Sequence, residues 1–220
     1  ALNVQRVERT AQLAAASAER IERHIHYALS QKNNHGISEA AGLFTVGLVF
    51  PGLNSSERWV RTGKRLLEQQ VAELIYADGA FSQHSANYHR LMLQTVLWCI
   101  RLGELNGVEL SRSCVDAARR SSDFLYKLVD VESGRAPNYG ENDGALTLPL
   151  SAMDRGDYRP VLQSAAILLE GSRRFPAGPW DEEAMWLFGG RLPGNDMPAA
   201  SSPAELRGGP GGCHTMRSEE

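Results

Sequence analysis

Cysteine is scarce in this chain of 220 residues, which holds Cys99, Cys114 and Cys213. An odd number of widely spaced thiols fits neither a disulfide framework nor a zinc site. Cys99 falls on an apolar helix face, so a buried thiol is the simplest interpretation. The cysteines do not decide the compartment, although a periplasmic or secreted location is slightly favoured over a cytoplasmic one.

Positive charge is not in excess either, because 23 Lys and Arg residues face 26 Asp and Glu residues, for a net charge of −3. Without a basic footprint we expect no binding to nucleic acid and no polybasic contact with a membrane. A polyanionic ligand is still allowed, because the field inside a cleft can differ in sign from that of the whole chain.

Long apolar runs are also missing, since none reaches the roughly 18 residues of a membrane-spanning helix. The longest candidate, AAGLFTVGLVFP, is short enough for a buried helix. The first thirty residues are charged and helical rather than typical of a signal peptide. Because the chain starts without Met, we expect that an upstream segment precedes it.

Strand-like alternation is absent before about residue 195, and apolar residues instead recur at three- and four-residue intervals. The segment KNNHG at 32–36 is predicted as a loop with Gly36 as its breaker, and residues 130–157 as a long irregular stretch of the kind that is usually functional. The predicted helices cover residues 4–31, 39–50, 54–77, 85–106, 113–129, 158–170 and 180–188. Helices joined by short loops predict an all-α domain of packed helical hairpins.

Polar side chains gather in three groups at helix ends or in loops. The groups are Asn33, Asn34 and His35 with Glu39; His84, Asn87, Tyr88 and His89; and Asn138, Tyr139, Asn142 and Asp143. Each residue alone has an ordinary structural explanation as a turn former, a helix cap, a core residue or a partner of the helix dipole. In a ring of hairpins, however, alternate loops share one rim, so the first two groups can face the same opening.

Four segments form a pattern that is more specific than any of its parts. They are NNHGISEAAGLFTVGLVFP at 33–51, ERWVRTGKRLLEQQVAELIYADGAFSQHSANYHR at 57–90, PNYGENDGALTLPL at 137–150 and DYRPVL at 157–162. In order and spacing they resemble the heparinase II/III-like polysaccharide lyases, which include heparin, heparan, alginate and oligo-alginate lyases. The resemblance covers about residues 20 to 190.

The resemblance implies an incomplete (α/α) toroid, followed by an antiparallel β-sandwich domain, with the active site between them. It implies cleavage of uronate-containing polysaccharides by β-elimination, with an anionic polysaccharide or oligosaccharide as substrate and without a metal or another cofactor. The Asn-His pair of the family corresponds to Asn34 and His35, and its catalytic tyrosine corresponds to Tyr88. The candidates for lining the sugar groove are Asn33, Glu39, His84, His89, Asn138, Tyr139, Asn142 and Asp143.

The chain departs from the family in two respects. Gln83 stands where the family pattern has a glutamate, and the β domain is missing apart from the start of its first strand, CHTMRS at 213–218. We therefore expect a toroid domain at 1–194 and a linker with the truncated start of the β domain at 195–220. The fragment alone should show little or no activity, because an absent catalytic group worth ~4 kcal/mol costs about a thousandfold in rate.

Other functions remain open at this point. A glycoside hydrolase on the same helical scaffold would need two carboxylates, which Glu39, Asp78, Glu141 and Asp143 could supply. A non-catalytic helical scaffold or carbohydrate-binding module would need no acid–base groups at all. A metal site made of His35, His84 and His89 is disfavoured, because the spacing from 84 to 89 does not stack on a helix.

Overall fold

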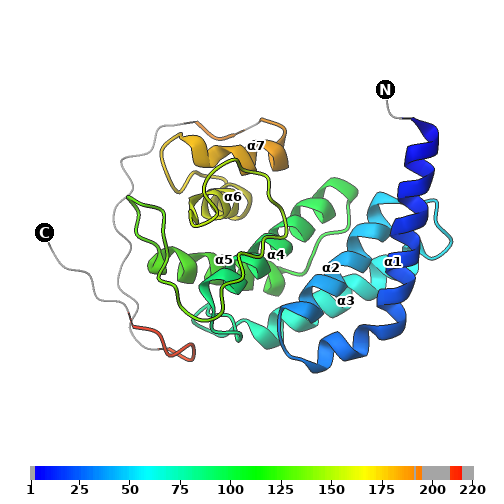
Figure 1. The fold of residues 1–220 in the computed structure, drawn as a ribbon, viewed down its shortest axis with the longest axis horizontal. Coiled ribbons are helices and arrows are strands. Elements are labelled where there is room, and N and C mark those ends of the chain that lie inside the picture. Colours follow the sequence, from blue (N-terminus) through cyan, green and yellow to red (C-terminus); the bar gives the residue numbers. More distant parts are fainter. Residues whose placement is uncertain (1–2, 191, 195–208, 215–220) are drawn as a thin grey trace, which may run out of the picture.

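The computed structural model describes residues 3–190, 192–194 and 209–214. Regular structure in these residues is helical, with one isolated antiparallel bridge between Ile75 and Phe81. The elements are α1 (Val4–Ser30), α2 (Asn34–Val49), α3 (Ser56–Leu74), α4 (Ala86–Asn106), α5 (Arg112–Leu128), α6 (Arg159–Glu170), the 3-10 helix η1 (Pro179–Asp181) and α7 (Glu182–Phe188) (Figure 1). The all-α prediction is therefore confirmed. None of the described helices combines the length and the apolar character needed to cross a membrane.

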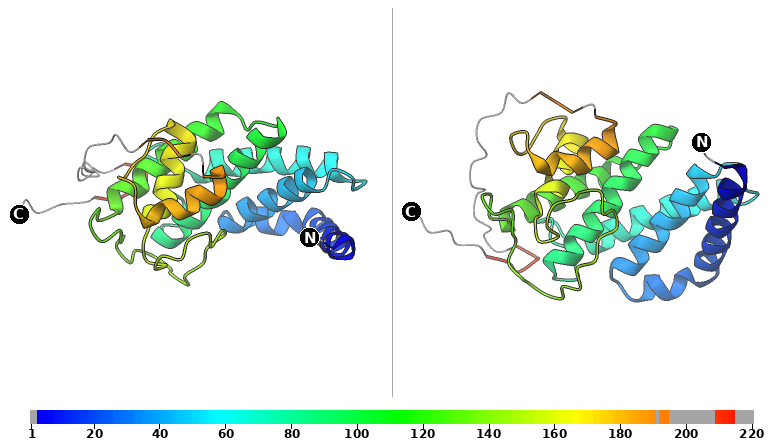
Figure 2. Two further views of the ribbon diagram at one scale, coloured as in Figure 1. Left: turned by 90° about the horizontal axis from the view of Figure 1, so that it is seen from above. Right: turned by 45° about the horizontal axis from the view of Figure 1, so that its top comes forward.

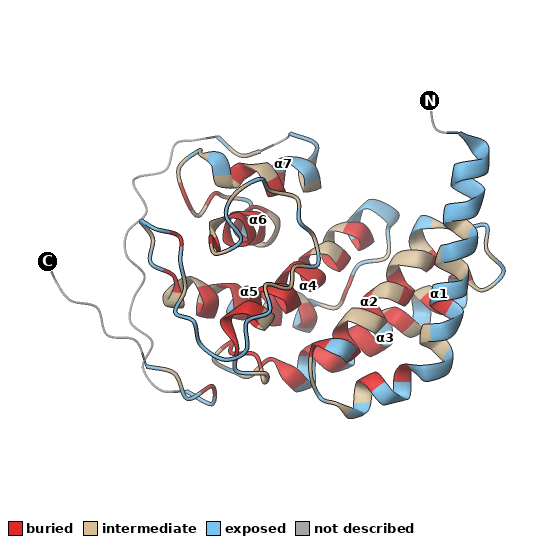
Figure 3. Cartoon of the chain, viewed as in Figure 1, coloured by how far each residue is buried: buried red, intermediate tan, exposed pale blue. Residues whose placement is uncertain are grey.

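The helices pack in chain order across the molecule. Helix α2 contacts α1, α3 and α4, and α6 contacts α4, α5 and α7. Figures 1 and 2 show α1 at one edge, α6 and α7 at the other, and α4 with α5 between them. The outer face of α1 is exposed, whereas α2 and α4 are largely buried (Figure 3). Burial of α2 is expected for a helix that is apolar on all sides, whereas α4 also buries polar side chains.

Two glycines allow α2 and α3 to approach closely. A Cβ atom on Gly63 would lie 2.5 Å from the backbone nitrogen of Phe44, and one on Gly47 would lie 2.6 Å from the carbonyl oxygen of Ser56. Backbone atoms cannot turn aside as a flexible side chain can. The two helices therefore pack at a distance that only glycine permits at these positions.

The start of α2 differs from its prediction. The helix begins at Asn34, and its N-cap is Asn33, whose side-chain oxygen accepts a hydrogen bond from the backbone nitrogen of His35 at 3.0 Å. The stretch KNNHG is thus not a loop that ends at Gly36. Gly36 lies inside the helix, where a Cβ atom would meet Oε1 of Gln70 at 2.5 Å, so its small size serves packing rather than a break.

Other boundaries follow the sequence more closely. Helix α4 begins after the N-cap Ser85 and ends at Gly107, which has the left-handed φ of 66°. Helix α3 begins at Ser56, two residues later than predicted, and it ends at Leu74, three residues earlier than predicted. The predicted strand at 213–218 lies largely outside the described residues, as do 195–208.

Residues 130–157 are irregular, as predicted, and they are fastened along α4. The backbone nitrogen of Ala86 donates to the carbonyl oxygen of Tyr139 at 3.0 Å. Farther along the helix, Gln94 donates to the carbonyl oxygen of Leu148 at 3.2 Å. The loop therefore delivers the third polar group to the N-terminal half of α4.

Candidate active site

The second and third polar groups meet at the start of α4. The hydroxyl of Tyr88 donates to Oδ2 of Asp143 at 2.8 Å, and Nδ2 of Asn87 donates to Oδ1 of the same carboxylate at 3.1 Å. Ser85 donates to the carbonyl oxygen of Glu141 at 2.5 Å. Gly140 makes this approach possible, because its φ is 72° and a Cβ atom there would lie 2.1 Å from the carbonyl oxygen of His84.

Acidic neighbours keep the phenol of Tyr88 protonated. The hydrogen bond to Asp143 raises the pKa of Tyr88, and burial and the negative charges of Asp143 and Glu141 add to the rise. Asp143 in turn has a lowered pKa, because Tyr88, the backbone nitrogen of Ala145 and Asn87 all donate to it. The pair is therefore a neutral phenol beside an ionised carboxylate at neutral pH.

The first polar group lies next to the others and is joined to them through Gln83. The backbone nitrogen of Asn34 donates to Oε1 of Gln83 at 3.2 Å, five residues before Tyr88. No direct hydrogen bond joins the side chain of Tyr88 to Asn34 or His35 in the part of the chain that the structure describes. The residue that departs from the family pattern thus accepts the hydrogen bond that connects α2 to the loop before α4.

Asn34, His35 and Glu39 differ in exposure. Asn34 is buried, whereas His35 is exposed, with Nδ1 2.7 Å from Oε1 of Gln31. Glu39 is half-buried, and burial raises the pKa of its carboxyl group against the opposing charges of His35 and His24. Its Oε2 is buried without a hydrogen-bond partner.

The two histidines of the second group take opposite positions. His84 is exposed and adopts the left-handed φ of 49°. His89 is 3% exposed, its Nε2 lies 2.9 Å from the carbonyl oxygen of Ser121, and its ring stacks on Phe124. Burial lowers the pKa of His89 to about 4. The expectation that His89 lines a sugar groove therefore needs correction, because one helical position beyond Tyr88 turns its ring into the core.

Asn138, Tyr139 and Asn142 line a cavity of about 370 Å³ at the start of α4, together with Asn87. This volume lies within the range of small-molecule sites, roughly 300–1,000 Å³. Asn33 is half-buried at the N-cap of α2 and does not line this cavity. The structure thus brings most of the third group to one hollow beside the Tyr88–Asp143 pair.

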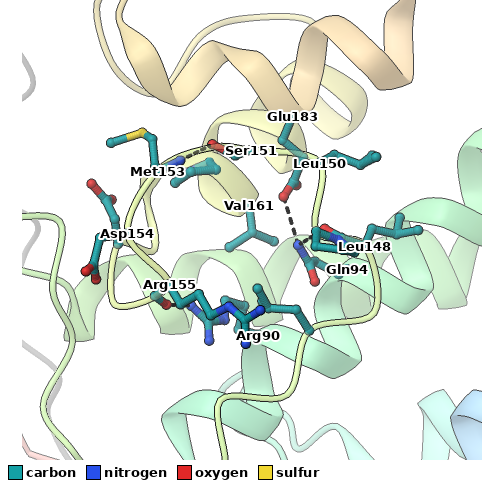
Figure 4. A pocket seen from close by; sticks show the side chains of 14 residues that line it. Arg90, Gln94, Leu148, Leu150, Ser151, Met153, Asp154, Arg155, Val161 and Glu183 are labelled. Atoms are coloured by element: carbon teal, nitrogen blue, oxygen red, sulfur yellow. Dashed lines mark hydrogen bonds between the residues drawn. The ribbon is translucent and has the colours of Figure 1, made fainter.

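A second cavity of about 140 Å³ lies deeper, between α4, the long loop and α7 (Figure 4). Gln94 donates to Oε2 of Glu183 at 2.8 Å, and burial raises the pKa of Glu183 to about 7. Arg90 lies on the wall of both cavities. No local sequence pattern indicates these three residues, because Gln94 and Glu183 are 89 positions apart and only tertiary packing brings them together.

In residues 3–190, 192–194 and 209–214, no three His, Cys, Asp or Glu side chains are grouped so that they could hold a metal ion.

Comparisons with known proteins agree with the sequence resemblance. The family model described as Heparinase II/III N-terminus matches residues 9–137. A heparin-sulfate lyase of Bacteroides thetaiotaomicron is 29% identical over 89 residues, which are 40% of this chain and 13% of that protein. A heparin-sulfate lyase of Pedobacter heparinus is 36% identical over 64 residues, which are 29% of this chain and 9% of that protein.

A solved structure titled Crystal Structure of Heparinase III is similar in fold, with a TM-score of 0.50 and 20% sequence identity. The similarity covers 61% of this chain and 20% of that one. The chain thus spans a small part of the relatives that it matches.

Proposed function

The chain belongs to the heparinase II/III N-terminus family, and on this premise we propose that it is the helical part of a polysaccharide lyase that cleaves uronate-containing chains by β-elimination. The substrate is an anionic polysaccharide of the heparan or alginate type. The names of the two relatives, both heparin-sulfate lyases, support the heparan type.

The reaction removes the C5 proton of a uronate and expels the oxygen linked at C4. That proton is very weakly acidic while the neighbouring carboxylate is fully charged, so donors must hold the carboxylate and stabilise the negative charge that grows on it. Asn34 and His35 suit this role, because they lie in the first turn of α2, where the helix dipole also favours an anion. His35 is exposed and can act as donor or as the base for the C5 proton.

The observation that carries the proposal is the hydrogen bond of 2.8 Å from Tyr88 to Asp143. It raises the pKa of Tyr88, so the phenol enters the reaction with its proton and serves as the acid. When substrate binds, the hydroxyl of Tyr88 turns from Asp143 toward the leaving oxygen and donates its proton to it. The phenolate that remains lies beside two carboxylates, which favour its return to the neutral form.

Residues 1–194 form part of an (α/α) toroid in this proposal, and residues 195–220 lead into a β-sandwich domain that supplies the remaining site residues. The helical hairpins and the fold similarity to heparinase III support this arrangement. The lyase assay therefore uses this chain with such a domain attached.

The test replaces Tyr88 with Phe, which removes the hydroxyl and keeps the ring. We expect substrate binding to persist and turnover to fall by ~10²–10⁴-fold, the usual contribution of a general acid. Elimination leaves an unsaturated uronate, which absorbs in the ultraviolet and reports the rate directly. Tyr27→Phe is the matched control, because Tyr27 is exposed on α1.

Two results would contradict the proposal. An unchanged rate in Tyr88→Phe would show that the phenol takes no part in the reaction. Products without a double bond would show that the wild-type protein hydrolyses the polymer, because hydrolysis forms no unsaturated uronate.

A further inference from the structure

We propose that the cavity of about 370 Å³ beside Tyr88 binds a second oxyanion of the sugar chain, a sulfate or a carboxylate, through Arg90, Arg135 and Arg155. The proposal rests on the proposed lyase function for the nature of the ligand. It adds a charge-binding site distinct from the carboxylate site at the start of α2.

The cavity lies between the N-terminal half of α4 and two stretches of the long loop, which supply Arg135 and Arg155. Asn87 lines it and also donates to Asp143, the partner of Tyr88. The cavity is therefore separated from the reactive phenol by one carboxylate and one amide, so a neighbouring substituent of the same polymer can enter it.

Arg90 carries the strongest indication of an anionic ligand. It is 4% exposed, yet no carboxylate in the described part of the chain lies within ion-pair distance of it. Its guanidinium donates to the carbonyl oxygen of Arg155 and, at 2.8 Å, to Oδ1 of Asn87, and its Nε has no partner. Buried charges are normally paired, so an arginine held only by neutral oxygens lacks a counter-ion.

The surrounding charges do not supply that counter-ion. Arg155 is exposed beside Arg90, as Figure 4 shows, and its positive charge adds to that of Arg90. Among the described residues, the ion-pair partner of Arg135 is Asp154 at 3.4 Å, and both side chains are exposed. Glu183 attracts Arg90 from a longer distance, and its own raised pKa of about 7 leaves it only partly charged near neutrality.

Packing fixes the guanidinium of Arg90 before any ligand arrives. Its Cζ lies 4.4 Å from the centre of the Tyr158 ring, and Asn87 holds it from the other side. Guanidinium groups bind sulfate and carboxylate oxygens through paired N–H donors, and a preorganised donor loses little entropy on binding. An anionic substituent in the cavity would neutralise the charge of the three arginines that line it.

The test measures the affinity of three probes by calorimetry: a sulfated heparan oligosaccharide, an unsulfated glucuronate-containing oligosaccharide and inorganic sulfate. The variant is Arg155→Gln, because Arg155 is exposed and its side chain forms no ion pair with any residue that the structure describes. The matched control is Arg65→Gln, an equal loss of charge on the exposed side of α3. All proteins also carry Tyr88→Phe, so that binding is measured without turnover.

We expect Arg155→Gln to weaken oligosaccharide binding about 10-fold or more, as for the loss of a hydrogen bond between charged groups. Arg65→Gln should leave it nearly unchanged. If the loss is confined to the sulfated probe and inorganic sulfate, the site takes a sulfate; if both oligosaccharides lose affinity equally, it takes a carboxylate. Equal affinities of Arg155→Gln and Arg65→Gln for every probe would overturn the proposal. Failure of elimination by the chain with its β-sandwich domain attached would instead refute the proposed function and leave this binding result standing.

Discussion

At the scale of single residues, the chemistry of Tyr88 depends on where the long loop places Asp143. Tyrosine can act as a base only when it is ionised, and positive neighbours would favour that form. Here the nearest charges are those of Asp143 and Glu141, which favour the protonated phenol. In the proposed lyase, this contact therefore favours the phenol as an acid over the phenolate as a base.

Asp143→Asn should lower the pKa of Tyr88, because an amide does not repel the phenolate as a carboxylate does. The phenolate absorbance, taken as the difference from the same variant with Tyr88→Phe, reports this pKa. In an active protein, the alkaline limb of the rate profile should move to lower pH. Asp154→Asn is the control, because Asp154 is exposed in the same loop and pairs with Arg135 instead. An unaltered phenol titration would show that Asp143 does not set the protonation of Tyr88.

At the scale of helices, the close approach of α2 and α3 positions the first polar group. Phe44 and Trp59 are fully buried in the core that these helices share. Because α2 begins at Asn34, the register of this packing also fixes the direction of the Asn34 and His35 side chains. A rigid helix start holds donors more precisely than a loop does.

Gly63→Ala should destabilise the protein by about 1–3 kcal/mol, the usual cost of overpacking a core. The new Cβ atom would lie 2.5 Å from the backbone nitrogen of Phe44 and 2.7 Å from the carbonyl oxygen of Ala40, so a helix must shift. Urea denaturation measures the free energy of unfolding. Gly52→Ala makes the same change where nothing lies within 4 Å, and it should change stability by less than about 0.5 kcal/mol. Equal stabilities of the two variants would refute the packing argument.

At the scale of the whole molecule, two buried titratable groups act on stability in opposite directions. Glu183 has a pKa of about 7, above its ordinary 4.5, so the folded chain holds this proton more tightly than the unfolded chain does. Stability from Glu183 is therefore present at low pH and is lost as pH rises from about 4.5 to about 7. His89 has a pKa of about 4, below its ordinary 6.5, so its contribution rises with pH between about 4 and about 6.5.

The two slopes should largely cancel in the wild-type protein, since each contribution is on the order of 3 kcal/mol. Glu183→Gln should leave stability rising with pH from about 4.5 to about 6.5, because the His89 contribution then exceeds the smaller opposing contribution of Glu39. His89→Gln should leave it falling over the same interval, with the raised pKa of Glu39 acting in the same sense as that of Glu183. Urea denaturation across this pH range measures both slopes. Identical slopes in the two variants would show that these groups do not control the pH dependence.

The sequence by itself determined the all-α class, the helix positions and the residues of the three polar groups. Helical periodicity and capping are local properties, so Ser85 and Gly107 mark the ends of α4 correctly. The start of α2 was predicted too late, because Gly36 lies inside the helix beside Gln70 and does not form a turn. A local pattern cannot distinguish these two uses of glycine.

Only the tertiary structure decided which polar residues act together. Asp143 meets Tyr88 across 55 positions of chain, and that contact sets the proton on the phenol. His89, next to Tyr88 in sequence, turns into the core, while Arg90 is buried without a carboxylate at ion-pair distance in the described part of the chain. Burial and charge pairing depend on residues far apart in the chain, and these two quantities fix the protonation and binding properties of the site.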